Sequence, residues 1–237
     1  MALTLELADN IIIEVTQKDI KNIHLSVFPP TGTARIAAPS RMNLETIRLF
    51  AISKLGWIKR EQQKLRSQNR ETPREYLTRE SHYVWGKRYL LKIIEMDAPP
   101  QVILEHRALV LQVRPNSDNA KREAILAAWH RERIKTVVPA LIAKWELILG
   151  VKVKRCFVQH MKTKWGSCNP KAGNIRLNTE LAKKPRECLE YIVIHEMMHL
   201  LEATHNQRFL TLMDQYMPSW RIQRDILNRL PVRYENW

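Results

Sequence analysis

The chain has 237 residues, of which 45% are hydrophobic and 27% charged, and its formal net charge at pH 7 is +15. This composition is ordinary for a globular protein and excludes a disordered or collagen-like chain. The length permits one large domain or two smaller ones with a substantial core. No apolar run approaches the ~20 residues of a membrane-spanning helix, so we expect no membrane segment.

The first part of the chain, residues 1–118, is predicted to be rich in β-structure with one helix. Turn residues separate short β-rich runs, which predict strands at residues 3–6, 11–16, 23–28, 35–38, 84–94 and 102–113. Apolar residues at helical spacing predict the helix, which begins at Asn43 and continues into a polar stretch at 59–70. Residues 71–81 are a predicted connector, and the sequence contains no visible internal repeat.

The pattern changes at the predicted boundary near residues 116–120, and residues 119–237 are expected to form a second domain. Apolar spacing predicts a long helix over 121–149, which Pro139 can kink and Gly150 ends. Strands are expected at 151–159 and 173–178, with a turn at 169–173. We expect these two strands to form a hairpin that leads directly to the next helix.

That next helix contains the pattern His-Glu-x-x-His at His195, Glu196 and His199. A helix turns by about 100° per residue, so residues four apart share a face and the two imidazoles can bind one metal ion. Glu196 points to the flank of this site, where it can accept a proton from metal-bound water without being a ligand. The helix is apolar nearly all round and should be buried, and metal coordination explains buried polar side chains there.

A catalytic zinc site needs a third protein ligand and one open position. His205 is the preferred third ligand, provided that the chain bends after Glu202, and Asn206 is a suitable N-cap for a following helix. The spacing from His195 to His205 is that of the metzincins, but Glu202 occupies their glycine position. Glu202 itself, or Asp214 in the next helix, is the alternative third ligand.

Positive charge is concentrated just before the histidine helix. Residues 121–186 contain 16 basic and 4 acidic residues, a formal net charge of +12. Such a surface attracts polyanions, so nucleic acid is a candidate partner of this region. The alternative is that these lysines and arginines only keep the protein soluble.

The three cysteines predict a reducing compartment. These residues are Cys156, Cys168 and Cys188. Because their number is odd and their spacing is not paired, we do not expect a disulfide scaffold. The N-terminal residues MALTLELADN have neither the basic start nor the cleavage site of a secretory signal. Together these features predict a cytoplasmic location.

Three motifs together resemble the YgjP-like metallopeptidases, which are predicted metal-dependent hydrolases related to SprT and WLM-type metalloproteases. The motifs are Trp165-Gly166-Ser167-Cys168, then Gly173-x-Ile175-x-Leu177-Asn178, then His195-Glu196-x-x-His199 with His205. The resemblance implies a zincin-like α+β fold, the three histidines as zinc ligands and Glu196 as the general base. The sequence departs from the family pattern after the third histidine, where Asn206 and Leu210 stand in place of Ser and Trp.

The sequence also predicts the roles of four further features near the motifs. Zincins bind an extended peptide along a strand edge, and strand 173–178 is our candidate for that edge. Trp165 is expected to pack in the core rather than to support substrate. Cys168 is expected to be a structural thiol rather than a ligand or nucleophile. His160 is expected to be a surface histidine rather than an oxyanion donor.

These features favour a zinc-dependent peptidase that acts on a polypeptide. A metal-dependent hydrolase of nucleotides or other small phosphorylated substrates is the first alternative, because the basic region would neutralise phosphate. A non-catalytic zinc-containing nucleic-acid-binding protein is the second. Glu196 weighs against that second alternative, because a structural zinc site has no use for a general base.

Overall fold

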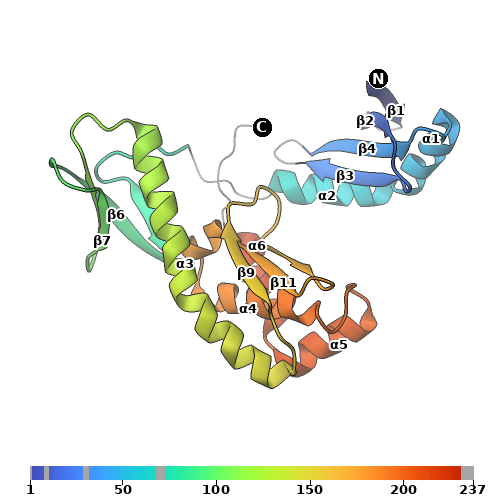
Figure 1. Cartoon of the computed structure of the whole chain (residues 1–237). Coiled ribbons are helices and arrows are strands. Elements are labelled where there is room, and N and C mark those ends of the chain that lie inside the picture. The colour runs from blue at the N-terminus through green and yellow to red at the C-terminus, as the bar shows by residue number, and fades with distance from the viewer. Residues whose placement is uncertain (1, 8–10, 29–31, 68–72, 231–237) are drawn as a thin grey trace. The chain divides into compact units, whose positions relative to one another are not determined.

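The computed structural model describes residues 2–7, 11–28, 32–67 and 73–230, which form an α+β fold (Figure 1). The chain separates into two compact units, one within residues 1–71 and the other within residues 72–230. The predicted domains, 1–118 and 119–237, stay a prediction. Among the described residues, no helix has both the length and the apolar composition to cross a bilayer.

The N-terminal unit is a four-stranded sheet followed by two helices. Its elements are β1 (Ala2–Leu7), β2 (Ile11–Lys18), β3 (His24–Phe28), β4 (Thr33–Pro39), α1 (Leu44–Ser53) and α2 (Leu55–Ser67). The strand order is β1-β2-β4-β3, with β2 and β4 parallel and the outer pairs antiparallel. Asn43 caps α1 as predicted, but the single predicted helix is two helices, because Lys54 leaves the helical backbone region at φ −102° and ψ 2°.

The second unit begins with another four-stranded sheet. Its strands are β5 (Ser81–Val84), β6 (Lys87–Glu95), β7 (Gln101–Leu104) and β8 (Ala108–Val113). The predicted strand at 84–94 agrees with β6 from Lys87 onward, whereas the predicted strand at 102–113 is wrong, because this range contains β7, β8 and the reversal between them. Trp85 and Gly86, both at positive φ, form the two-residue turn between β5 and β6.

The two sheets repeat one topology. The second sheet has the order β5-β6-β8-β7, with β6 and β8 parallel and the outer pairs antiparallel, and a helix follows it as α1 follows the first sheet. The sequence itself shows no internal repeat, so the repetition is one of strand order. The repeat was not visible because strand pairing tolerates many different apolar residues at equivalent positions.

The long helix α3 (Asn119–Leu149) agrees with its prediction to within two residues. The Asp118 side chain accepts a hydrogen bond from the backbone N–H of Lys121 at 2.8 Å and so caps the helix. Gly150 ends the helix in the left-handed conformation, at φ 65°. Pro139 lies inside the helix.

A third sheet, of three strands, covers the histidine helix. It contains β9 (Arg155–Gln159), β10 (Gly166–Asn169) and β11 (Asn174–Asn178), in the order β10-β11-β9. The hairpin is formed by β10 and β11, while β9 runs parallel to β11. The predicted hairpin between 151–159 and 173–178 is therefore wrong. The predicted edge strand is wrong as well, because β11 lies in the middle of the sheet.

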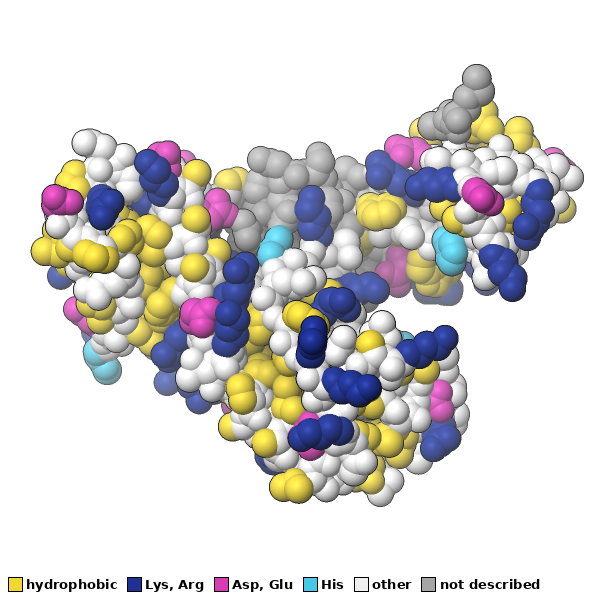
Figure 2. All heavy atoms as spheres, in the orientation of Figure 1, with side chains coloured by type: hydrophobic (Ala, Val, Ile, Leu, Met, Phe, Trp, Pro, Cys, Tyr) yellow, Lys and Arg dark blue, Asp and Glu magenta, His cyan; other side chains and the backbone are white. Residues whose placement is uncertain are grey.

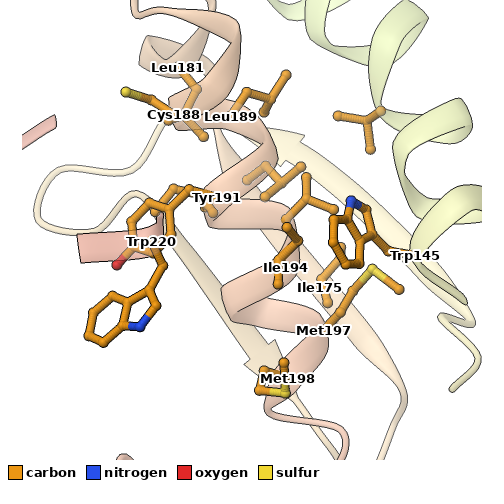
Figure 3. Packing of buried hydrophobic residues seen from close by; sticks show 14 of the residues in the cluster. Trp145, Ile175, Leu181, Cys188, Leu189, Tyr191, Ile194, Met197, Met198 and Trp220 are labelled. Atoms are coloured by element: carbon orange, nitrogen blue, oxygen red, sulfur yellow. The ribbon is translucent and has the colours of Figure 1, made fainter. Parts of the chain in front are cut away.

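The largest core surrounds the histidine helix. After the short helix η2 (Thr179–Lys183) come α4 (Arg186–Met198), α5 (Gln207–Tyr216) and α6 (Trp220–Arg229). Ile175, Ile194 and Met197 are fully buried together, and Tyr191 stacks on Trp220 at 6.4 Å between ring centroids (Figure 3). Each such large apolar side chain contributes about 1.5–3 kcal/mol by burial, so α4 is firmly held.

The start of α4 is fixed by the turn between β5 and β6. The backbone N–H of Trp85 donates to the carbonyl of Ala182 at 2.8 Å, and that of Gly86 donates to Lys183 at 3.1 Å. A Cβ on Gly86 would approach Pro185 Cγ to 2.9 Å, so this turn lies directly against the residue before α4. The second sheet therefore helps to fix the helix that carries the histidines.

Candidate active site

The His-Glu-x-x-His pattern lies at the C-terminal end of α4. His195 and Glu196 are in the last turn, and His199 is the C-cap. The backbone N–H of Glu202 donates to the carbonyl of Met198 at 2.9 Å, so one more helical turn follows α4, and the chain then bends at Ala203 and Thr204. Asn206 caps α5 by accepting from the backbone N–H of Phe209 at 3.0 Å. The predicted bend after Glu202 and the predicted cap are confirmed.

This bend brings the three histidines together. One ring nitrogen from each of His195, His199 and His205 lies within 4.8 Å of the other two. The Nε2 atoms of His195 and His205 are 3.0 Å apart. All three rings contact the buried ring of Phe209, with centroid distances of 5.1, 4.8 and 4.8 Å. His205 is exposed while the other two are half-buried, so the cluster faces solvent on the His205 side.

The protonation of these histidines suits metal binding. Burial, reinforced by the two neighbouring histidines, lowers the pKa of His195 to about 3. Burial also lowers the pKa of His199, whose Nδ1 lies 3.1 Å from the carbonyl oxygen of Glu202. A carbonyl can only accept, so Nδ1 of His199 carries the proton and Nε2 keeps its lone pair for a metal. Both rings are neutral near pH 7, which is the form that binds a metal ion.

Glu196 is buried beside this cluster, with 5% of its surface exposed. Burial raises the pKa of its carboxyl group to about 8, and the positive charge of Lys164 acts in the opposite direction. A divalent cation at the histidines would lower this pKa again by Coulomb attraction. Glu196 is not among the residues whose ligand atoms converge.

The two alternative third ligands have other partners. The Glu202 carboxylate accepts from the side chain of Thr204 at 3.2 Å. The Asp214 carboxylate accepts from the indole N–H of Trp220 at 2.7 Å and from Arg221. Neither carboxylate belongs to the convergent group found among the described residues. The geometry therefore favours His205.

The other expected residues lie outside the histidine cluster. Trp165 packs against the main core, as predicted. Cys168 is half-buried. Burial is the main cause that raises the pKa of its thiol to about 11, and the nearby charge of Glu196 adds to it. A raised pKa fits a structural thiol. His160 is exposed and does not belong to the cluster.

Two residues of this region were not predicted. The Phe209 ring packs against all three histidine rings, and its place in the first turn of α5, shortly after His205, was the available signal. Gly166 lies against the Glu196 side chain, and a glycine inside a strand is a sign of such close approach.

A convergent histidine triad next to a buried carboxylate, on an α+β scaffold, is the arrangement of a metal-dependent hydrolase. A sequence model described as the YgjP-like metallopeptidase domain matches residues 21–230. The match spans most of the chain, which therefore belongs to the YgjP-like metallopeptidase family. A comparison with curated proteins gives no match.

Two solved structures are similar to part of the chain. The metallopeptidase zymogen jannalysin of Methanocaldococcus jannaschii is 22% identical over 39% of this chain and 89% of its own, with a TM-score of 0.35. The metallopeptidase zymogen abylysin of Pyrococcus abyssi is 26% identical over 39% of this chain and 90% of its own, also with a TM-score of 0.35.

Proposed function

We propose that the protein is a zinc-dependent peptidase with a zincin-like catalytic domain within residues 119–237. The observation that carries the proposal is the convergence of His195, His199 and His205 within 4.8 Å. Membership of a metallopeptidase family supports it. The cytoplasmic location stays a prediction, in keeping with three free cysteines.

The three histidines are the residues that would hold the metal. Neutral imidazole suits zinc, and three protein ligands with one open position are typical of catalytic rather than structural zinc sites. When bound, zinc supplies Lewis acidity, which makes water a stronger acid and a peptide carbonyl a stronger electrophile. The exposed position of His205 leaves this side of the cluster accessible to substrate.

Glu196 is the proposed general base. Its carboxylate accepts a proton from the attacking water and then donates that proton to the leaving amine. Burial on a rigid helix holds the carboxylate beside the histidines without making it a ligand.

The proposed peptide-binding edge is β10, in place of strand 173–178. Within the described part of the chain, β10 pairs with β11 and with no second strand. Its first residue, Gly166, lies against Glu196. An extended peptide that added to this edge would place its backbone next to the general base.

The reaction type can be tested directly. Casein and nucleoside triphosphates are incubated side by side with one zinc-loaded preparation, and peptide release and phosphate release are measured. We expect cleavage of casein that a chelator abolishes and added zinc restores, because the histidines require the metal. Phosphate release without peptide release would favour the phosphohydrolase alternative.

Nucleic acid is a second candidate partner, through the outer face of the third sheet. Phe157 is 37% exposed there, and the Arg176 guanidinium lies 5.5 Å from its ring centroid. Exposed Arg155 lies on the same face of β9 as Phe157. Figure 2 shows Lys and Arg side chains gathered over the region that Figure 1 labels β9 and β11. An aromatic ring among cations suits single-stranded nucleic acid.

We expect single-stranded DNA to bind this face with an affinity that falls steeply with salt. The reason is that arginine and lysine side chains that contact phosphates displace the counterions condensed on the DNA. In a fluorescence anisotropy titration, Arg155→Gln and Arg176→Gln should each reduce the salt slope by about 1. Arg48→Gln, on the N-terminal unit, is the matched control and should leave the slope unchanged. Absence of binding at roughly 50 mM salt would leave the charge as a solubility feature.

A further inference from the structure

Gly166 lies in unusually close contact with the side chain of Glu196. A Cβ atom added to Gly166 would be 2.6 Å from Oε1, 2.8 Å from Cγ and 2.9 Å from Cδ of Glu196. Separations under about 3 Å are far inside van der Waals contact, so one of the two groups would have to move. In the structure the Glu196 side chain thus lies against the bare backbone of β10.

The backbone conformation does not explain this glycine. The glycines at positive φ, where other residues are strained, are Gly32, Gly86, Gly150 and Gly173. Gly166 is not among them; it is a regular strand residue that pairs with Leu177. Strand positions ordinarily favour larger side chains, and glycine there weakens the strand. Glycine is required here because the Glu196 side chain fills the space that a Cβ atom would occupy.

Neither the Glu196 side chain nor the backbone at Gly166 can move away easily. Glu196 is 5% exposed, and the residues that follow it, Met197 and Met198, are fully buried. On the other side, the backbone N–H of Asn178 donates to the carbonyl of Trp165 at 2.9 Å. The Asn178 side-chain amide also donates to the carbonyls of Met161 and Lys164, at 2.7 and 2.8 Å. These bonds fix the chain immediately before Gly166.

We propose that Gly166 is a positioning residue for Glu196: the missing side chain admits the carboxylate to the face of β10 and sets its place beside the three histidines. The catalytic significance of this contact rests on the proposed peptidase function. The contact itself does not, because it is a property of the folded chain alone. Stability and activity measurements can therefore judge the two separately.

A double-mutant cycle on thermal unfolding tests the contact. In the wild-type background, Gly166→Ala should lower the unfolding midpoint by about 5 °C, because the new methyl group overlaps a buried side chain. In the Glu196→Ala background, the atoms that it would meet are absent, so the same change should have little effect. An equal loss in both backgrounds would overturn the proposal, since Gly166 would then serve the strand alone.

Activity and zinc content supply the second readout. Gly166→Ala should retain its zinc by elemental analysis and lower kcat by about 10²-fold with little change in KM, as expected when a catalytic group is displaced by about 1 Å. Gly56→Ala, in α2, is the matched control, because its new Cβ would meet only Arg60 Nη1 at 3.7 Å. Wild-type kcat in Gly166→Ala would overturn the proposal. A wild-type protein without peptidase activity would instead contradict the proposed function, and the stability cycle would still decide the contact.

Discussion

Glu196→Gln is expected to retain zinc and the native fold while peptide hydrolysis falls by at least about 10²-fold, the loss typical of removing a general base. Glutamine keeps the size of the side chain, so its close fit against Gly166 is preserved. It loses the ability to accept a proton from the attacking water. The measurements are kcat on casein or a derived peptide and zinc content by elemental analysis.

Two results would contradict this assignment. Loss of zinc from Glu196→Gln would mean that Glu196 is a ligand, in conflict with its place outside the convergent histidine group. Near-native turnover with zinc retained would exclude the general-base role. The control is Glu187→Gln, a carboxylate in the first turn of the same helix, which should retain both zinc and activity.

The histidine cluster was predictable from the sequence because its causes are local. Helical periodicity places His195 and His199 one turn apart, and the N-cap preference of Asn206 locates the start of α5. The bend that delivers His205 lies between these two fixed elements. A ligand cluster formed within eleven consecutive residues therefore depends little on the rest of the fold.

The third sheet was not predictable because its causes are distant in sequence. β10 has the sequence Gly-Ser-Cys-Asn, which lacks the β-branched and aromatic residues that indicate a strand. Without β10, the parallel strands β9 and β11 look like hairpin arms. The contact between Gly166 and Glu196 joins residues thirty positions apart, and only the tertiary structure reveals it.

The two-fold repetition of the strand order escaped detection for a related reason. Pairing direction is set by connections and turns, such as the positive-φ turn at Trp85 and Gly86, rather than by the apolar pattern of any one strand. Reading 102–113 as one strand hid the hairpin of β7 and β8 in the second sheet. The same oversight concealed its likeness to the sheet of the N-terminal unit.

Replacing any one of His195, His199 and His205 by alanine is expected to remove most of the roughly one zinc per chain and to abolish hydrolysis, because two remaining imidazoles hold zinc weakly. Even the loss of groups that only orient a zinc ligand lowers affinity by about 10–100-fold, so loss of a ligand should do at least as much. Elemental analysis after dialysis against a metal buffer measures the effect. His106→Ala, at an exposed position between β7 and β8, is the matched control.

His205→Ala is the most informative of the three changes. His205 is exposed, so its removal disturbs little packing, whereas His195 and His199 are half-buried beside Phe209. Zinc that binds only the folded state should raise the unfolding free energy of the wild type by about 2.7 kcal/mol at a concentration 100 times Kd. We expect His205→Ala to match the metal-free wild type in unfolding midpoint and to gain little from added zinc. A full zinc-dependent gain in His205→Ala would move the third ligand to Glu202 or Asp214, because the protein would then hold its metal without the histidine that the bend delivers.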